Sequence, residues 1–393
     1  MKLAPLLLLG VLSTANACGG DDSSPAGTGG SAGAGGAAGA AGTGGGAGGG
    51  QLTGCSPDVT LLAKDADPSK TGPWPVGART GTVGTLTVEV WYPAAPGSEQ
   101  GKKPKVYDIR SWLPDSEKTK IPDSENPWQS GAGFADLPLD GDHGPYPAVV
   151  FVHGTAGWRT QSLHHMEHWA SRGFVVIAAD HPGLYLGDLL DFQLQKDLPK
   201  DLDALVAAVG APSGDLAFLS GHVDATRLGM AGHSAGGAAV GPRGADARVL
   251  IPLAAGGSQA GAKLESTLVM GAQADKVVEY PKTVAGYDAS PKKKRLVGLA
   301  KAGHLFPSDL CWLDNGSGQN ILEVAQKYQI KNANLAGALF DCPTDNLSQA
   351  DSRAVVDYAT TAALEETLYC VAGDRFADLK TRFPAVAEYR QDL

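Results

Sequence analysis

Residues 227–237 read "RLGMAGHSAGG" and gather four glycines around a single serine, Ser234. The first half of the stretch has the apolar character of a buried strand, and "AGGAAVG" after the serine is compatible with a helix. Glycine adds no side chain to a core, so its concentration here indicates that the backbone turns where larger residues would collide. The spacing Gly232-x-Ser234-x-Gly236 therefore predicts a sharp turn from strand to helix, with the serine hydroxyl at its apex.

A serine at such an apex is a candidate nucleophile, but its hydroxyl reacts weakly unless a base accepts its proton and an acid orients that base. His304, in "KAGHLF", is the one histidine after Ser234 and follows an expected strand. Asp275 ends the apolar run "TLVMGAQAD" between them. The sequence therefore predicts Ser234 as nucleophile, Asp275 as orienting acid and His304 as base. Three other carboxylates are candidates for the acid. Glu265 precedes that run, and Glu279 and Asp288 lie further into the connection that follows it.

The stretch "VVFVHGTAGW", residues 149–158, is expected to supply half of an oxyanion hole. It ends a strongly apolar run, and the backbone N–H after its first glycine belongs to Thr155. With the N–H of Ala235, at the start of the expected helix, it gives two donors for the charge of a tetrahedral intermediate. Trp158 and His233 are assigned to the substrate pocket, although Trp158 could equally serve to pack the loop.

Apolar runs rich in β-branched residues alternate with helical patterns along the chain. This alternation predicts the α/β class, in which helices cover both faces of a mostly parallel central sheet. Residues 96–145 and 311–350 break the alternation, and each is interpreted either as a lid or binding loop or as plain surface. The expected strands are 85–93, 146–154, 173–180, 227–234, 247–255 and 266–275, and a last one is contained in 294–304.

The beginning of the chain has the features of an exported protein. Residues 1–17, "MKLAPLLLLGVLSTANA", combine a lysine, a short apolar run and a small-residue cleavage site, as signal peptides do. Cys18 follows at once, and "TANAC" resembles the lipobox of bacterial lipoproteins, with plain cleavage and secretion as the alternative. Residues 18–54 are almost wholly Gly, Ala, Ser and Thr, which predicts a flexible tether before a catalytic domain at 55–393.

Four cysteines remain after Cys18, an even number that predicts two disulfides in an exported chain. Three pairings are open, and the preferred one joins Cys311 to Cys342 and Cys55 to Cys370. A zinc site on these cysteines is not expected, because no two of them are closely spaced.

The segment "HHMEH" is a candidate zinc site, because His164 and His168 are one helical turn apart, with His165 and Glu167 between them. Its spacing is not His-Glu-x-x-His and the sequence places no third ligand. A solvent-facing helix is therefore the preferred interpretation, and no metal or cofactor is predicted.

The formal net charge of −10 argues against nucleic acid as a partner. The basic run "PKKKR" at 291–295 is expected to be a loop or a solvated face.

Residues 80–370 resemble the platelet-activating-factor acetylhydrolase and dienelactone-hydrolase-like branch of the α/β-hydrolases, with bacterial cutinase-like polyester hydrolases as near kin. The motifs that carry the resemblance are "VEVWYPA", "PAVVFVHG", "GFVVIAADHPG", "VDATRLGMAGHSAGG" and "AGHLFPSDLC". The resemblance implies the α/β-hydrolase fold, no cofactor, and the roles already given to Ser234, Asp275 and His304. Serine where dienelactone hydrolases carry cysteine implies ester hydrolysis. Thr155 and Ala235 stand where polyester hydrolases usually carry an aromatic residue and methionine.

Together these features predict an exported serine carboxylic-ester hydrolase that acts on small or lipid-like esters through an acyl-enzyme intermediate. The expected partners are the ester and, through the lipid anchor, a bacterial membrane. The alternatives are a cutinase-like polyester hydrolase, a catalytically inactive surface binding protein, and a peptidase or acyltransferase on the same scaffold.

Overall fold

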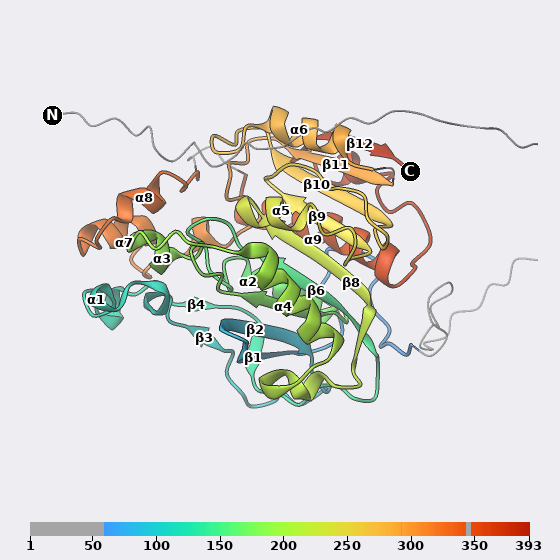
Figure 1. The fold of residues 1–393 in the computed structure, drawn as a ribbon, viewed down its shortest axis with the longest axis horizontal. Helices are drawn as coiled ribbons and strands as arrows, with labels where there is room; N and C mark the ends of the chain where they lie inside the picture. Colours follow the sequence, from blue (N-terminus) through green and yellow to red (C-terminus); the bar gives the residue numbers. More distant parts are fainter. Residues whose placement is uncertain (1–58, 292, 343–346) are drawn as a thin grey trace, which may run out of the picture. The chain divides into compact units, whose positions relative to one another are not determined.

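A ten-stranded sheet forms the centre of the computed structural model, which describes residues 59–291, 293–342 and 347–393 (Figure 1). Antiparallel pairs lie toward both edges of the sheet, and its middle is parallel. In order across the sheet, the strands are β12 (Val386–Asp392), β11 (Lys294–Leu299), β10 (Ser266–Ala272), β9 (Val249–Leu253), β8 (Val223–His233), β6 (Tyr146–Val152), β7 (Val175–Ala179), β2 (Leu86–Pro93), β1 (Val76–Val83) and β5 (Gly133–Ala135).

The six strands from β7 to β11 are parallel and almost completely buried. Every residue of β6, β9 and β10 is buried, which is why these segments are almost continuously apolar instead of alternating; Ser266 and Thr267 at the start of β10 are the polar exceptions. Successive side chains still point to opposite faces: Val149 and Phe151 contribute to one core, Val150 and Val152 to the other.

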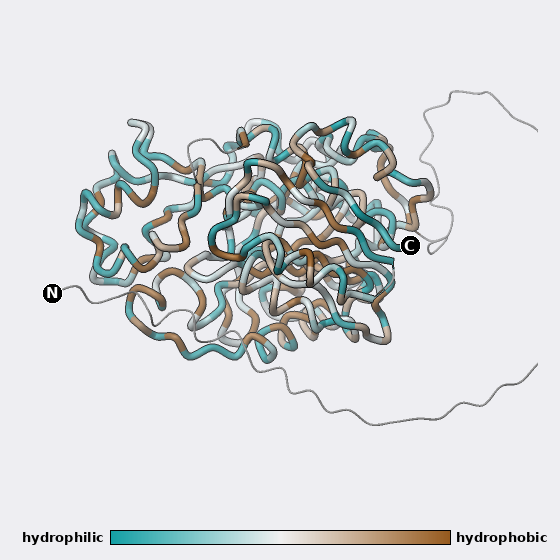
Figure 2. The backbone as a smooth tube through the Cα atoms, turned by 90° about the horizontal axis from the view of Figure 1, so that it is seen from above, coloured by the Kyte–Doolittle hydropathy of each residue, from teal (hydrophilic) through white to brown (hydrophobic). Residues whose placement is uncertain are grey.

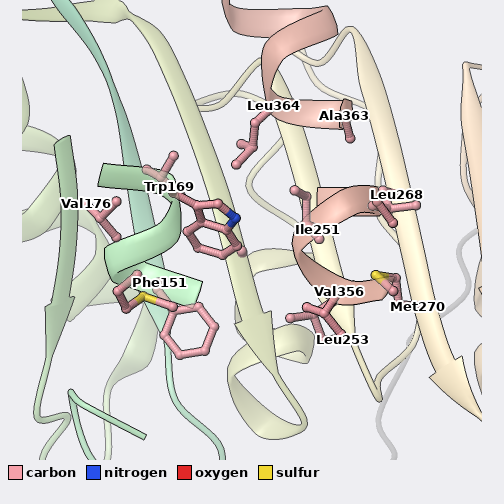
Figure 3. Close-up of a cluster of buried hydrophobic side chains, with 14 of the residues drawn as sticks. Phe151, Trp169, Val176, Ile251, Leu253, Leu268, Met270, Val356, Ala363 and Leu364 are labelled. Atoms are coloured by element: carbon pink, nitrogen blue, oxygen red, sulfur yellow. The ribbon is translucent and has the colours of Figure 1, made fainter. Parts of the chain in front are cut away.

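Helices α2 (Leu163–Ser171) and α9 (Gln349–Leu368) contact each other and cover one face of the sheet. Figure 3 shows Trp169 of α2 beside Phe151. It also shows apolar residues of α9, among them Val356 and Leu364, facing the strands of the sheet. The side chain of Ser348 caps α9 by accepting the N–H of Asp351 at 3.2 Å, which satisfies one of the free donors at the start of the helix.

Helices α4 (Leu198–Gly210), α5 (Ala235–Val240) and α6 (Tyr280–Ala289) cover the opposite face. The buried residues of α4 recur at helical spacing, so one stripe of the helix faces the sheet. The hydrophobic segments are concentrated in the interior and the hydrophilic ones lie mostly around it (Figure 2).

The two stretches that break the alternation come together at one end of the sheet (Figure 1). We call this assembly, residues 106–130, 186–190 and 310–340, the cap. Its apolar cluster joins Ile121 to Leu190 and to Val324, Ile330 and Ala333. Its elements are β3 (Val106–Tyr107), η1 (Ile109–Trp112), α1 (Asp115–Lys118), η2 (Asp123–Glu125), β4 (Gln129–Ser130), α3 (Leu186–Leu190), η4 (Leu310–Trp312), α7 (Ile321–Lys327) and α8 (Ala333–Gly337).

The predicted α/β class is confirmed, and each predicted strand overlaps an observed one. Two local expectations are wrong. Lys294 and Arg295 are not solvated, because they lie in β11 with exposed fractions of 9% and 4%. The histidines of helix α2 do not all face solvent, because His165 and His168 are buried against α9.

A disulfide joins Cys311 to Cys342, as predicted, and closes the second half of the cap. The pairing of Cys55 with Cys370 stays a prediction, because Cys55 lies outside the described residues. The predicted signal peptide, the lipidated Cys18 and the tether also lie outside them. Within the described part of the chain, no helix is both long enough and apolar enough to cross a bilayer.

Candidate active site

Ser234 lies in the turn between β8 and α5, in the strained conformation that the glycine spacing predicts. Its φ is 55° and its ψ is −118°, a region that costs a non-glycine residue about 1–3 kcal/mol. A Cβ on Gly232 would overlap the carbonyl of Gly236, and a Cβ on Gly236 would overlap the carbonyl of Val152. Strand and helix therefore pass so closely that only glycine fits at both positions.

Asp275 follows β10 and His304 follows β11, and their side chains form a buried pair. Nδ1 of His304 lies 2.8 Å from Oδ2 of Asp275. The other carboxylate oxygen accepts the N–H groups of Val277 and Val278, both at 2.8 Å, so the carboxylate cannot rotate freely. A carboxylate held in this way fixes the imidazole tautomer with the proton on Nδ1, which leaves Nε2 of His304 for proton transfer.

The ring of His233 connects the serine turn to the histidine loop. Its Nε2 lies 2.9 Å from the carbonyl oxygen of His304, and its Nδ1 lies 3.0 Å from the amide nitrogen of Gln161. Burial, reinforced by the charge of His304, holds the pKa of His233 well below its usual range. The neutral ring therefore donates from Nε2 to the carbonyl and accepts at Nδ1 from Gln161. His233, predicted to line the substrate pocket, instead holds the two loops together.

The loop after β6 brings Thr155 next to the serine turn. A Cβ on Gly154 would lie 3.2 Å from the Cβ of Ser234, so the two backbones are in close contact. Throughout the described residues, the N–H groups of Thr155 and Ala235 donate to no protein acceptor. Two free donors beside a serine are what a developing oxyanion requires.

His153 supports this loop as a neutral group. Burial, together with the charge of His181, lowers the pKa of His153 to about 3. Its Nδ1 donates to the carbonyl of Gly154 at 2.8 Å, and its Nε2 accepts the N–H of His181 at 3.2 Å. His153 therefore orients the loop after β6 and carries no charge near neutral pH.

An apolar pocket lies between this loop and the cap. Its lining includes Thr155 and Trp158 from the loop and Leu305, which directly follows His304. The empty volume is about 800 Å³, with open solvent included. Trp158 also stacks on Trp112 of the cap, with ring centroids 5.4 Å apart, so it both lines the pocket and packs the loop. The cap supplies most of the remaining lining residues.

A second polar cluster joins His164 and His165 of α2 to Asp357 of α9, with the three ligand-type atoms close enough to hold a metal. Its distances, 2.9 Å and 2.6 Å from histidine nitrogen to carboxylate oxygen, are those of hydrogen bonds. Burial alone would raise the pKa of Asp357, but the charges of His168 and His165 and the hydrogen bonds from His164 and His165 hold it well below its usual range. The cluster therefore links two helices as an ion-paired network.

Three polar residues of the site were missed from the sequence. Asp341 accepts the N–H of His304 at 2.9 Å and the N–H of Lys276 at 3.0 Å, so it holds both loops of the buried pair. Gln161 bridges His233 and the loop after β6, and Asp180 accepts the indole N–H of Trp112 at 2.9 Å. No spacing in the sequence distinguishes these residues from surface polar residues.

A parallel sheet with a strained serine after one strand, and an acid and a histidine after two later ones, is the α/β-hydrolase fold. No family model matches the sequence, and no curated protein matches it. Among solved structures, the chain is similar to the ferulic acid esterase from Streptomyces cinnamoneus, with a TM-score of 0.54 and 18% sequence identity. The match covers 80% of this chain and 96% of that one, and it shows a common fold. The branch of the fold named by the sequence motifs stays a prediction.

Proposed function

We propose that this chain is a serine carboxylic-ester hydrolase. The observation that carries the proposal is the buried Asp275–His304 pair, joined through His233 to the strained turn of Ser234. The similarity to an esterase structure supports the same class of chemistry.

In the proposed mechanism, Oγ of Ser234 attacks the ester carbonyl while Nε2 of His304 accepts its proton. Asp275 stabilises the imidazolium that forms, and the N–H groups of Thr155 and Ala235 hold the oxyanion. His304 then protonates the leaving alcohol and activates a water molecule that releases the acid from Ser234. No step in this sequence requires a cofactor.

The cap favours small or lipid-like esters over a polyester. Its two halves line the apolar pocket, and Trp158 of the lining stacks on Trp112 of the cap. These two aromatic side chains are therefore occupied in packing. Trp128 and Trp312 of the cap are exposed, with exposed fractions of 44% and 37%, so a cutinase-like polyester hydrolase remains the second candidate.

We also propose that the protein is exported and anchored by a lipid on Cys18. The support comes from the signal-like residues 1–17 and the lipobox-like "TANAC". The disulfide between Cys311 and Cys342 agrees with an oxidising compartment.

The test compares the purified protein with its Ser234→Ala variant on p-nitrophenyl acetate and with a fluorophosphonate probe. We expect hydrolysis and covalent labelling by the wild type, no labelling of the variant, and a loss of about 10⁶-fold in kcat. A wild type that neither hydrolyses the ester nor becomes labelled would leave the inactive binding protein as the better description. Amide hydrolysis at a comparable rate would favour a peptidase.

A further inference from the structure

The walls of the pocket beside Thr155 come from segments that are far apart in the sequence. The residues between 109 and 127 form one side, and the residues between 321 and 340 form the other. Both walls are almost entirely aliphatic, with side chains such as Ile109, Leu113, Ile121, Val324, Ile330 and Leu339. An apolar surface of this extent, directly beside the candidate oxyanion loop, favours a hydrocarbon ligand.

The one charged residue in the lining, within the described chain, is Arg110, and its charge is already matched. Its guanidinium binds the carboxylate of Asp108 through two nitrogens at 2.7–3.1 Å and that of Asp123 at 2.7 Å. The pocket therefore offers no unpaired cation for an anionic ligand. Apart from Arg110, Asn126 and Thr155 its lining is apolar, so apolar contact dominates its specificity.

Polar contacts hold the two walls together on the outside of the pocket. Glu117 accepts the backbone N–H of Lys331 at 2.7 Å, and the ammonium of Lys120 donates to the carbonyl of Gln329 at 3.3 Å. A further ion pair joins Glu125 to Lys327 at 2.8 Å. These contacts, together with the disulfide that closes residues 311–342, keep the walls in place so that the aliphatic surfaces face each other.

We propose that this pocket binds an aliphatic chain of the ester, so that the cap selects medium-length chains over acetate. The proposal rests on the proposed ester hydrolase function, since the chain must reach the pocket while its carbonyl lies at Thr155 and Ser234. The chain can belong to the acid or to the alcohol, and the pocket's chemistry is the same for both.

The experiment measures kcat/KM of the wild type in two series. One series contains p-nitrophenyl acetate, butyrate, hexanoate and octanoate, and the other contains methyl, butyl, hexyl and octyl acetate. Each methylene buried in the pocket is expected to raise kcat/KM about fourfold, from the usual gain on burying one CH₂. A rise in the first series places the acyl chain in the pocket, and a rise only in the second places the alcohol there.

Two substitutions fill the pocket, Ala336→Phe and Ala325→Phe, since both alanines line it. Each is expected to lower the ratio of kcat/KM for the longest chain to kcat/KM for the shortest chain by at least tenfold, in whichever series rises. Ala338→Phe is the matched control. Ala338 is the C-cap of α8, the helix that contains Ala336, but it is exposed and does not line the pocket. It is expected to leave both rates and their ratio unchanged.

The outcomes separate this proposal from the proposed function. Acetate hydrolysis with flat or falling kcat/KM in both series would overturn the chain pocket and leave the esterase intact. Equal ratios for the wild type and both filling variants would overturn it as well, provided that circular dichroism shows the variants folded. Absence of any ester hydrolysis and of fluorophosphonate labelling would instead overturn the esterase itself.

Discussion

The strain at Ser234 predicts that its replacement by glycine stabilises the protein more than its replacement by alanine. Both variants lose the hydroxyl, so the comparison isolates the backbone. Alanine keeps a side chain at φ 55° and ψ −118°, whereas glycine adopts this conformation without steric cost. The difference between the two variants therefore measures the free energy that the folded chain spends on presenting the serine.

The expected size follows from two opposing effects. Relief of the strained conformation is worth about 1–3 kcal/mol, and the greater freedom of glycine in the unfolded chain costs about 0.4–1 kcal/mol. We therefore expect Ser234→Gly to exceed Ser234→Ala in free energy of unfolding by about 1 kcal/mol.

The assay is guanidinium unfolding of the two variants, followed by tryptophan fluorescence under non-reducing conditions. The control is Ala207→Gly at an exposed position within α4, where glycine is expected to destabilise by about 1 kcal/mol. Replacing alanine by glycine should therefore raise the free energy of unfolding at position 234 and lower it at position 207. This difference in sign would indicate local strain at Ser234. If the alanine variant at 234 is as stable as the glycine variant or more so, the turn stores no strain and the argument is wrong.

Three further predictions concern the carboxylates and the serine turn. Asp275→Asn is expected to lower kcat on p-nitrophenyl acetate by about 10⁴-fold, because His304 loses the acceptor that fixes its tautomer. Gly236→Ala is expected to lower the free energy of unfolding by about 1–3 kcal/mol, since its Cβ would overlap a strand carbonyl. Asp357→Asn is expected to destabilise by about 3–5 kcal/mol, because it leaves buried histidines without their partner. That loss should be largest between about pH 4 and pH 6.5.

The pH window follows from two pKa shifts. The pKa of Asp357 is lowered in the folded protein, so its stabilising contribution is lost as the pH falls below the unfolded value of about 3.9. Burial alone would lower the pKa of His164, but the hydrogen bond and charge of Asp357 raise it. The contribution of His164 is therefore present below its unfolded pKa of about 6.5 and is lost as the pH rises through its raised folded value.

Two substitutions serve as controls for the stability predictions. Gly256→Ala has open space around its Cβ and should be silent, and Asp142→Asn is exposed and should show no pH-dependent effect. Unchanged kcat in Asp275→Asn would remove that carboxylate from the mechanism. A destabilisation by Asp357→Asn that does not vary with pH would mean that its charge contributes little.

The serine turn and the parallel strands were predictable because their causes are local. Glycine spacing around Ser234 reflects a steric requirement within five residues, and β6, β9 and most of β10 are apolar because both faces are covered. The pairing of Asp275 with His304 could be expected from chain order, since the ends of neighbouring parallel strands meet at one edge of the sheet.

Other parts were not predictable because their signals are not periodic. Helix α9 is buried around nearly its whole circumference, so no apolar stripe reveals it. Strand β12 is an edge strand with mostly half-exposed polar residues, and it lacks the apolar run that marks a central strand. Asp341 and Asp357 bond to residues that lie 37 and 192 positions away in the sequence, and no local pattern predicts such contacts.

The disulfide between Cys311 and Cys342 constrains a segment that ends beside the buried pair of Asp275 and His304. It closes a segment with a sequence separation of 31, a constraint worth about 3–4 kcal/mol in chain entropy. Cys342 directly follows Asp341, the residue that holds the loops of His304 and Asp275. In a chain that folds before this bond forms, the turn of Ser234 would be complete but the loops of His304 and Asp275 would be less firmly held. Formation of the bond would then be the last step that fixes their arrangement.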